Sequence, residues 1–353
     1  MKMQTFSRLS VIILALWASI AAQISPKIVG GELVSITEYP YQVALLNNSQ
    51  IVCGGTLISA EWVLTAAHCE AAKLTHVAVG VDQAAEARQL KRSIREQIIH
   101  EKYKNTGHSL ASDFKYDIAL LRIDPVTFSS TVQPLPFLGY GSYELPYQEL
   151  VVSGFGSTFP WGGGSDGELR AVKLKHVFYD REVLRKTYGN NFVDNFTAAE
   201  VVLAGSDSQE NKDSCKGDSG GPLVVNISGR KFLVGVVSFG PPVCTGQVPG
   251  VYTSVAHYWE WIYAKTKVLP LPFLLPNVVY GKTRIYSAVP LSNFKFVATE
   301  GVRITVGSDY LDIEGSEGKA KVTVSYQDKD ILEQYIEFFP AIVPKKLFGC
   351  STK

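Results

Sequence analysis

The ten residues from Asp213 to Pro222, Asp-Ser-Cys-Lys-Gly-Asp-Ser-Gly-Gly-Pro, carry the pattern on which the interpretation of the whole chain depends. Within ten positions they can hold a nucleophile, Ser219, glycine-flanked backbone donors around Gly217, and a separate carboxylate, Asp213. An Asp-Ser-Gly tripeptide alone is common in loops. The stretch therefore predicts chemistry only if a base and a second carboxylate occur elsewhere in the chain.

Two earlier motifs supply such partners. Leu-Thr-Ala-Ala-His-Cys ends at Cys69 and contains His68, and Tyr-Asp-Ile-Ala-Leu-Leu begins at Tyr116 and contains Asp117. A lone His is more often a structural hydrogen-bonding residue than a base, and a strand-end Asp often caps a turn. An acid that enters an apolar strand nevertheless needs a partner. Together with Ser219, these two residues could supply a base and a carboxylate that orients it.

These three motifs together resemble those of the trypsin-like serine proteases, the chymotrypsin fold family, from Ile28 to about Lys267. The resemblance implies that His68 is the general base and that Asp117 orients it. It further implies that Ser219 forms an acyl-enzyme and that the amides of Gly217 and Ser219 form the oxyanion hole. It implies no cofactor.

Substrate choice follows from the same resemblance. Asp213, six positions before Ser219, matches the residue at the base of the primary pocket, where a carboxylate favours Arg or Lys side chains. The alternative is a solvated loop acid near Lys212. The other substrate-binding positions that the resemblance implies are Ser238, Phe239, Gly240 and Gly250, with Phe239 standing where the family usually has Trp.

The resemblance also implies a zymogen. Lys27 precedes Ile28-Val-Gly-Gly, and cleavage after Lys27 would free an Ile28 ammonium that pairs with the buried carboxylate of Asp218. Residues 23–27 are then an activation peptide. Disulfides are expected between Cys53 and Cys69 and between Cys215 and Cys244, which leaves Cys350 without an assigned partner. A disulfide that many relatives carry is replaced here by Leu184 and Leu203.

The N-terminus resembles a secretory signal over residues 1–22, because basic residues precede a short apolar run and then small residues. That run is too short to span a bilayer, so we predict a secreted, extracellular protein without a membrane span. In that compartment three sequons become candidate glycosylation sites, at Asn47, Asn195 and Asn226.

Composition excludes several classes of protein. The 353 residues are 46% hydrophobic and 19% charged with a net charge of +1, which suits a globular chain and gives no electrostatic reason to bind nucleic acid. Residues 162–164 are Gly-rich but lack the Lys-Ser/Thr of a phosphate loop. The segment 81–88 is shorter and less acidic than the calcium loop of many relatives. We therefore predict no metal site.

Short apolar strands separated by turns indicate an all-β fold. The resemblance makes it a chymotrypsin-like double six-stranded antiparallel β-barrel with a C-terminal helix, over residues 28–267. A Pro-rich linker, 268–276, leads to a module, 277–353, in which hydrophobic residues alternate with polar ones, as in a small antiparallel β-sandwich. A helix is expected over residues 180–188. The partner of the module is unknown.

The sequence thus favours a secreted endopeptidase that cleaves protein or peptide substrates after Arg or Lys and that protein inhibitors could control. A second hypothesis is a catalytically silent, protease-like binding protein acting through its surface loops and the C-terminal module. Inactive relatives usually lack one of the three catalytic residues. All three are present here, at positions 68, 117 and 219.

Overall fold

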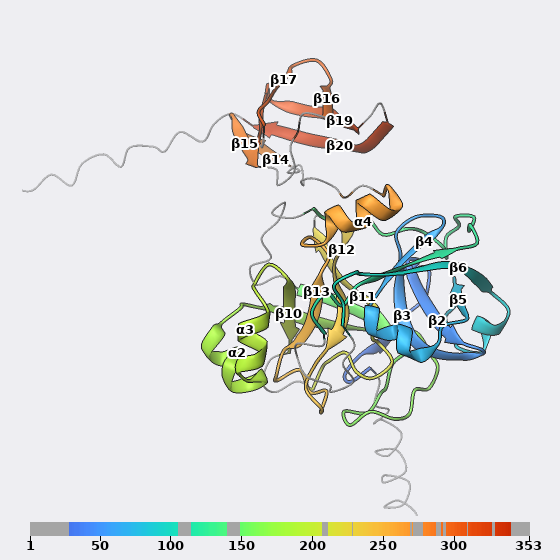
Figure 1. Cartoon of the computed structure of the whole chain (residues 1–353). Coiled ribbons are helices and arrows are strands. Elements are labelled where there is room, and N and C mark those ends of the chain that lie inside the picture. Colours follow the sequence, from blue (N-terminus) through green and yellow to red (C-terminus); the bar gives the residue numbers. More distant parts are fainter. Residues whose placement is uncertain are drawn as a thin grey trace, which may run out of the picture.

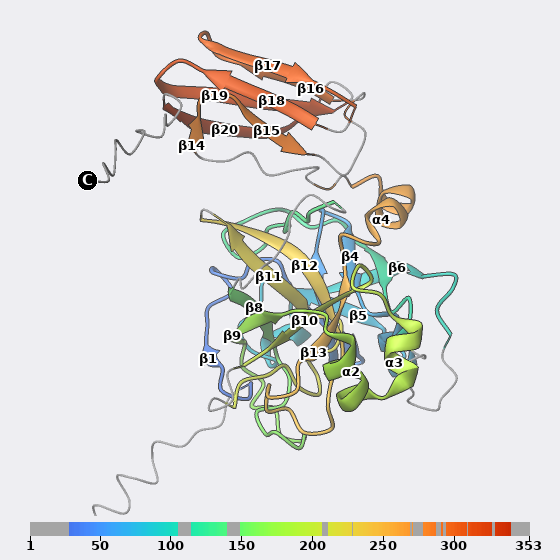
Figure 2. The ribbon, with the colours of Figure 1, turned by 90° about the vertical axis from the view of Figure 1, so that its left-hand side faces the viewer.

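The structure is a computed structural model that describes residues 28–104, 114–139, 149–206, 211–227, 229–268, 270, 278–286, 291, 294–308, 310–326 and 329–339. The expected signal and activation peptides with Lys27, most of the linker and Cys350 lie outside these residues. Two β-barrels lie side by side, and a third group of strands lies beyond the helix α4 (Figures 1 and 2).

The first barrel is closed, with six antiparallel strands in the order β2-β3-β4-β7-β6-β5. Its strands are β2 (Gln42–Asn47), β3 (Gln50–Leu57), β4 (Trp62–Thr65), β5 (His76–Val79), β6 (Lys91–Ile99) and β7 (Ala119–Ile123). In β2, Val43 and Leu45 enter one core cluster while Ala44 and Leu46 enter another. A strand with both faces buried reads as a continuous apolar run, as this one does.

The second barrel closes in the order β9-β10-β13-β12-β11-β8, because β8 also pairs with β9. Its strands are β8 (Glu149–Gly154), β9 (Arg170–Val177), β10 (Val201–Gly205), β11 (Pro222–Ile227), β12 (Arg230–Phe239) and β13 (Gly250–Ser254), with the short β1 (Glu32–Leu33) added at β9. The double six-stranded barrel expected from the sequence is confirmed.

Packing between the barrels positions the functional residues. Val224, Leu233 and Val236, from β11 and β12, belong to the same buried cluster as the interior of the first barrel. Ser219 lies just before β11, and its carbonyl accepts a 2.7 Å hydrogen bond from the amide of Gly54 in β3. The start of β11 is therefore fixed against the barrel that carries His68.

Helices are few and short. The described residues form α2 (Arg181–Tyr188), α3 (Asn190–Asn195) and α4 (Trp259–Thr266), together with the 3-10 helices η1 (Ala67–Ala72) and η2 (Glu86–Arg88). The carboxylate of Asp180 caps α2 by accepting from the amides of Glu182 and Val183, which explains why the helix begins there. The helix expected over 180–188 is thus present, whereas α3 was not expected.

The C-terminal strands form a four-stranded sheet, β14-β20-β19-β16, and a three-stranded sheet, β15-β18-β17. They are β14 (Val278–Tyr280), β15 (Thr283–Tyr286), β16 (Phe294–Ala298), β17 (Val302–Val306), β18 (Tyr310–Gly315), β19 (Gly318–Tyr326) and β20 (Lys329–Phe339). All pairings are antiparallel except β14 with β20, which is parallel. The expected C-terminal β-sheets are present, but the parallel pairing of β14 with β20 departs from the wholly antiparallel sandwich that was expected.

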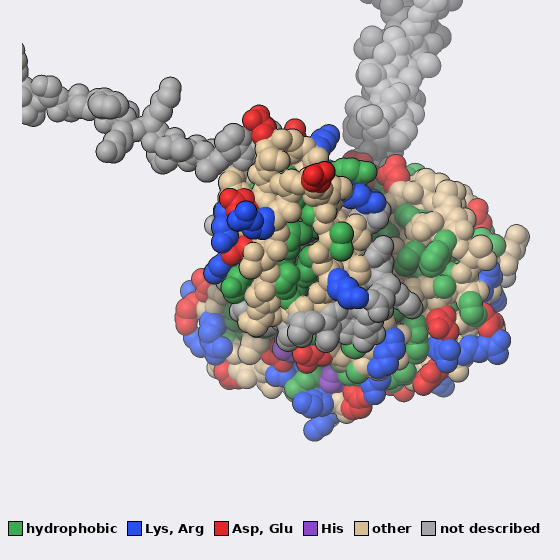
Figure 3. Space-filling model, turned by 90° about the horizontal axis from the view of Figure 1, so that it is seen from above, with side chains coloured by type: hydrophobic (Ala, Val, Ile, Leu, Met, Phe, Trp, Pro, Cys, Tyr) green, Lys and Arg blue, Asp and Glu red, His purple; other side chains and the backbone are tan. Residues whose placement is uncertain are grey.

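The core of this module follows the predicted alternation. Leu311, Ile313, Val322 and Val324 are at most 1% exposed. Val306, which belongs to the same alternating pattern, is instead 44% exposed, because β17 is an edge strand of its sheet. Figure 3 looks down on this end of the molecule and shows hydrophobic side chains between charged ones.

Candidate active site

A cavity of about 330 Å³ contains side chains from both barrels. His68 reaches it from η1, which follows β4, and Ser219 reaches it from the turn before β11. Asp213 and the 237–240 end of β12 form other parts of its wall. The cavity therefore brings together residues that are far apart in the chain. Cys69 Sγ, for example, lies 3.6 Å from the carbonyl oxygen of Ser219, which is 150 positions later.

His68 and Asp117 form a pair with well-defined geometry. His68 Nδ1 lies 2.8 Å from Asp117 Oδ2, and the amide of His68 donates to Asp117 Oδ1 at 2.9 Å. Asp117 is completely buried, and Ser238 Oγ donates to its Oδ2 at 2.5 Å. With Nδ1–H directed at the carboxylate, Nε2 is left as the basic nitrogen.

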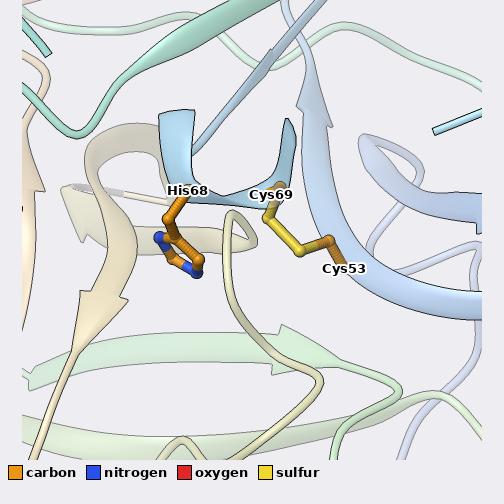
Figure 4. Close-up of side chains that lie close together, drawn as sticks. All are labelled: Cys53, His68 and Cys69. Atoms are coloured by element: carbon orange, nitrogen blue, oxygen red, sulfur yellow. A yellow bond between two sulfur atoms is a disulfide. The ribbon is translucent and has the colours of Figure 1, made fainter. Parts of the chain in front are cut away.

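Three effects set the pKa of His68, and two of them oppose the third. Burial lowers the pKa, but the negative charge of Asp117 and its hydrogen bond to the ring outweigh burial, and the net result is a pKa raised above the ordinary value. Figure 4 shows the ring beside the disulfide that joins Cys69 to Cys53. That bridge closes a loop of 16 residues and holds η1 on β3.

The turn around Ser219 requires glycine. Gly217 has a φ of +100°, and Gly220 has a φ of +78° with no room for a Cβ, which would lie 2.1 Å from Thr65 Oγ1. The neighbouring amides of Asp218, Gly220 and Gly221 donate to backbone carbonyls. Among the described residues, the amides of Gly217 and Ser219 have no such acceptor. These two unused donors flank Asp218, and an oxyanion is stabilised by such backbone donors.

Ser219 Oγ is not hydrogen-bonded to His68 among the described residues, although both line the cavity. Contacts of this kind are often long in substrate-free enzymes and shorten when substrate binds. The geometry thus brings His68, Asp117 and Ser219 to one site.

Asp213 is a buried carboxylate that lacks full compensation. It is 1% exposed, its Oδ2 accepts from the amide of Gly246 at 3.1 Å, and its Oδ1 is buried without a hydrogen-bond partner among the described residues. Burial raises the pKa of Asp213 to about 7, against the smaller lowering effect of its backbone hydrogen bonds. An orphaned carboxylate oxygen in a cavity wall is a site for a cationic or donor group of a ligand.

The other expected pocket residues also line this cavity: Ser238, Phe239, Gly240 and Gly250. A Cβ placed on Gly240 would lie 3.8 Å from the Cα of Gly250, so the two glycines face each other closely. The Cys215–Cys244 disulfide, which the structure contains, forms another part of the wall. Small residues at two wall positions leave room for a long side chain to approach Asp213.

Asp218 directly precedes Ser219 and is completely buried. Its two oxygens accept 2.9 Å hydrogen bonds from the amides of Gly156 and Cys215, and no cation pairs with it in the described part of the chain. Burial raises the pKa of Asp218 to about 6. Ile28 is also fully buried, and the carbonyl of Val29 accepts from the amide of Asp213 at 3.1 Å.

A metal site is not supported at this position. The described residues contain one group of three metal-capable side chains, Cys53, His68 and Cys69. The two sulfurs are bonded to each other (Figure 4), so neither can act as a thiolate ligand.

A family model described as trypsin matches residues 28–262, which is more than half of the chain. The chain belongs to the trypsin family. Transmembrane protease serine 11A of Homo sapiens is 32% identical over 246 residues, which are 69% of this chain and 56% of that protein. This chain therefore spans little more than half the length of that relative.

Two other relatives agree with this assignment. Hypodermin-A of Hypoderma lineatum is 34% identical over 243 residues, covering 67% of this chain and 86% of that protein. The solved structure of neuropsin, a serine protease expressed in the limbic system of mouse brain, has a TM-score of 0.56 and 28% identity. It covers 66% of this chain and 97% of its own. Among the described residues, no helix is long and apolar enough to cross a membrane.

This trypsin-family chain has one feature near the site that sequence reasoning missed. Phe114 lies edge-on to His68, with ring centroids 5.7 Å apart, and stacks on Phe239 at 4.9 Å. Phe239 in turn contacts Phe192 and Phe196 of the α3 region. The spacing of Tyr188, Phe192 and Phe196, each four residues apart, is the sequence signal that could have indicated an aromatic cluster.

The same cluster contains the two leucines that stand at the positions of the absent disulfide. Leu184 and Leu203 are 1% and 2% exposed and belong to one buried group with Phe192 and Phe196. Both leucines are therefore packed in a buried cluster although no disulfide joins them. Apolar packing joins α2 to β10 in place of a covalent link, and it continues through Phe239 and Phe114 to His68.

We expect Leu184→Ala to lower the free energy of unfolding by about 2–5 kcal/mol, because it leaves a cavity inside this aromatic cluster. The measurement is urea unfolding of the full chain followed by intrinsic fluorescence. Val183→Ala is the matched control, since Val183 is the adjacent helical residue and is 52% exposed. An equal shift in both variants would show that the cluster does not stabilise the region.

Proposed function

We propose that this trypsin-family chain is a secreted serine endopeptidase, made as a zymogen, that cleaves peptide bonds after Arg or Lys. The observation that carries the proposal is the cavity in which the His68–Asp117 pair, Ser219 and the orphaned carboxylate oxygen of Asp213 occur together. The family match supports the peptidase chemistry, and Asp213 supports the choice of substrate.

In the proposed reaction, Ser219 Oγ attacks the carbonyl carbon of the scissile bond while His68 Nε2 accepts the hydroxyl proton. The carbonyl oxygen becomes an oxyanion at the unused amides of Gly217 and Ser219, each donor contributing roughly 3 kcal/mol to the transition state. His68 then gives its proton to the leaving amine, the C–N bond breaks, and water hydrolyses the ester on Ser219. Asp117 holds the ring and stabilises the imidazolium.

The buried carboxylate of Asp218 supports the proposal that the chain is made as a zymogen. Among the described residues the buried carboxylate has only neutral backbone donors, so an ammonium would stabilise it strongly. Cleavage after Lys27 would create that ammonium on Ile28, which is already buried and whose neighbour Val29 accepts from the amide of Asp213. The new ion pair would fix the turn from Cys215 to Ser219 and with it the oxyanion hole.

Cleavage at Lys27 gives the first test. The secreted full chain should be inactive towards an arginyl ester and gain activity when a Lys-specific protease cuts after Lys27, whereas Lys27→Gln should stay inactive under the same treatment. Appearance of an N-terminal Ile28 in sequencing identifies the cut. Full activity of the uncut chain would contradict zymogen control.

The pH dependence gives a second test, because two groups must be unprotonated. His68 must be neutral to accept a proton, and its pKa is raised; Asp213 must be ionised to attract Arg, and its pKa is raised to about 7. Asp213 therefore loses its charge as the pH falls below about 7, and His68 becomes protonated as the pH falls through its raised pKa. Since kcat/KM reports the free enzyme, its logarithm should fall with a slope approaching two.

The kcat profile separates these groups. In the substrate complex the bound guanidinium keeps Asp213 ionised, so kcat should fall with a slope of one, from His68 alone. An ester with a neutral apolar side chain at the cleaved position is the control, and its kcat/KM should also show a slope of one. Identical slopes for both esters would mean that Asp213 does not titrate in the free enzyme.

Secretion makes glycosylation part of the proposal. Asn226 is exposed at the end of β11, whereas the side-chain nitrogen of Asn195 donates two hydrogen bonds to Asn191, at 2.6 and 2.7 Å. Asn47 is half-buried at the end of β2. Asn226 is therefore the sequon best placed to carry a glycan.

The silent binding protein is the weaker candidate. Every side chain that the chemistry requires is present, and the base is already oriented by Asp117. A fluorophosphonate probe separates the two functions, since an active peptidase is labelled at Ser219 and a pure binding protein is not.

A further inference from the structure

Tyr116, the residue directly before Asp117, has a backbone conformation that bulky residues rarely adopt. Its φ is +62°, in the left-handed region. A residue with a large side chain keeps this conformation only where the surrounding structure enforces it, and such residues cluster at active sites. The contacts around Tyr116 therefore bear on the placement of the carboxylate that follows it.

The backbone turns sharply at Asp117. The amide of Ile118 donates to the carbonyl of Tyr116 at 2.8 Å, which closes a three-residue turn centred on Asp117. The carbonyl of Ile118 in turn accepts from the amide of His100 at 3.1 Å. The carboxylate that orients His68 thus leaves the chain from a tight turn, and the φ of Tyr116 sets the direction in which the chain enters that turn.

The ring of Tyr116 is held by two other rings and two ammonium groups. It stacks on the imidazole of His100, with ring centroids 5.0 Å apart and planes inclined by 18°. Tyr258 lies edge-on to both rings, 6.2 Å from Tyr116 and 5.4 Å from His100. The ammonium groups of Lys102 and Lys115 each lie 5.6 Å from the centre of the Tyr116 ring. Rotation of the backbone to a negative φ would carry the ring out of these contacts.

These contacts are anchored in other parts of the fold. Tyr258 is 5% exposed and directly precedes α4, whose Trp261 lies 5.1 Å from the His100 ring. Lys115 Nζ forms a 3.2 Å ion pair with Glu200, which is 8% exposed and directly precedes β10. The ring is therefore braced from α4 and from the second barrel.

We infer that Tyr116 is a positioning residue for catalysis: its ring, stacked on His100, holds the left-handed backbone that directs the carboxylate of Asp117 at His68. This inference rests on the proposed peptidase function, in which His68 is the base. Burial lowers the pKa of His68 and Asp117 raises it by more. Misalignment of Asp117 should therefore lower this pKa as well as the rate.

The test uses the full chain cleaved after Lys27 and the pH profile of kcat for an arginyl ester, whose acid limb reports His68. Tyr116→Ala removes the ring and should lower kcat about 10- to 100-fold, with KM within about threefold of the parent. Its acid limb should move about one pH unit lower. Tyr116→Phe keeps the ring and should restore both values to within about twofold of the parent.

Variants of the stacking partner test the same contact with Tyr116 unchanged, and they carry the test if Tyr116→Ala does not fold. His100→Ala should resemble Tyr116→Ala, whereas His100→Phe keeps a ring against Tyr116 and should resemble the parent. Tyr335→Ala is the matched control, since Tyr335 is 67% exposed on β20, and it should change neither value. Each rate is divided by the folded fraction, measured by circular dichroism at the assay temperature.

A parental kcat in the two alanine variants at positions 100 and 116 would overturn the inference. A lower kcat with the acid limb unmoved would also overturn it, because the loss would then not pass through Asp117 and His68. Absence of arginyl ester hydrolysis by the cleaved parent would instead overturn the proposed function itself.

Discussion

The Ser219→Ala protein, cleaved after Lys27, is expected to hydrolyse an arginyl ester about 10⁶-fold more slowly than the parent. Alanine removes the one oxygen that can form the acyl-enzyme and leaves His68 with no proton to accept. The side chain is small and the turn is held by the backbone of Gly217 and Gly220, so the fold should persist. The measurement is single-turnover hydrolysis together with labelling by a fluorophosphonate probe.

Binding should survive where catalysis fails, because Asp213 and the pocket walls are untouched. A reversible guanidinium inhibitor should bind the Ser219→Ala protein with an affinity within about threefold of that for the parent. Ser130→Ala, on an exposed loop, is the control and should change neither measurement. Ester hydrolysis by the Ser219→Ala protein at the parental rate would exclude the acyl-enzyme mechanism.

The parts of this site that could be predicted from sequence are those encoded by short local motifs. His68, Asp117 and Ser219 each lie within a short stretch of sequence that can be read as a motif. Glycines such as Gly220 are required by the local turn. Apolar runs such as that in β2 likewise predicted strands. The closure of each barrel came from the resemblance, because pairing such as that of β8 with β9 depends on contacts far apart in the chain.

What could not be predicted depends on side-chain packing between distant segments. Phe114 and Phe239 are 125 positions apart by their numbers, yet they stack beside His68. Leu184 and Leu203 indicated only that a disulfide was absent, and the aromatic cluster around them needed the tertiary structure to be seen. The hydroxyl of Ser238 was expected near substrate, and its hydrogen bond to Asp117 was not anticipated.

Asp213→Asn should reduce activity and increase stability at the same time. The amide keeps the shape of the carboxylate but loses the charge that attracts Arg or Lys. Removing one partner of a buried ion pair costs about 3–5 kcal/mol, so kcat/KM for an arginyl ester should fall roughly 10²- to 10⁴-fold. Esters with apolar side chains should be hydrolysed at rates near those of the parent.

Stability should change in the opposite direction, because the free enzyme holds Asp213 buried with one oxygen unpaired. Its pKa is raised to about 7 in the folded state and is about 4 in an unfolded chain, so burial of the charged form destabilises the fold increasingly as the pH rises through this window. The Asn variant avoids that cost. Its melting temperature should exceed that of the parent at pH 8, and the difference should shrink at pH 4.

The control for both measurements is Asp194→Asn, which removes an exposed carboxylate from α3 and should alter neither specificity nor the pH dependence of melting. A variant that still preferred Arg over apolar esters would show that Asp213 does not select the substrate. A melting temperature lowered equally at pH 4 and pH 8 would show instead that Asp213 stabilises the wall through its bond to Gly246, with the charge playing no part. The two readouts together thus separate the electrostatic role of this carboxylate from a structural one.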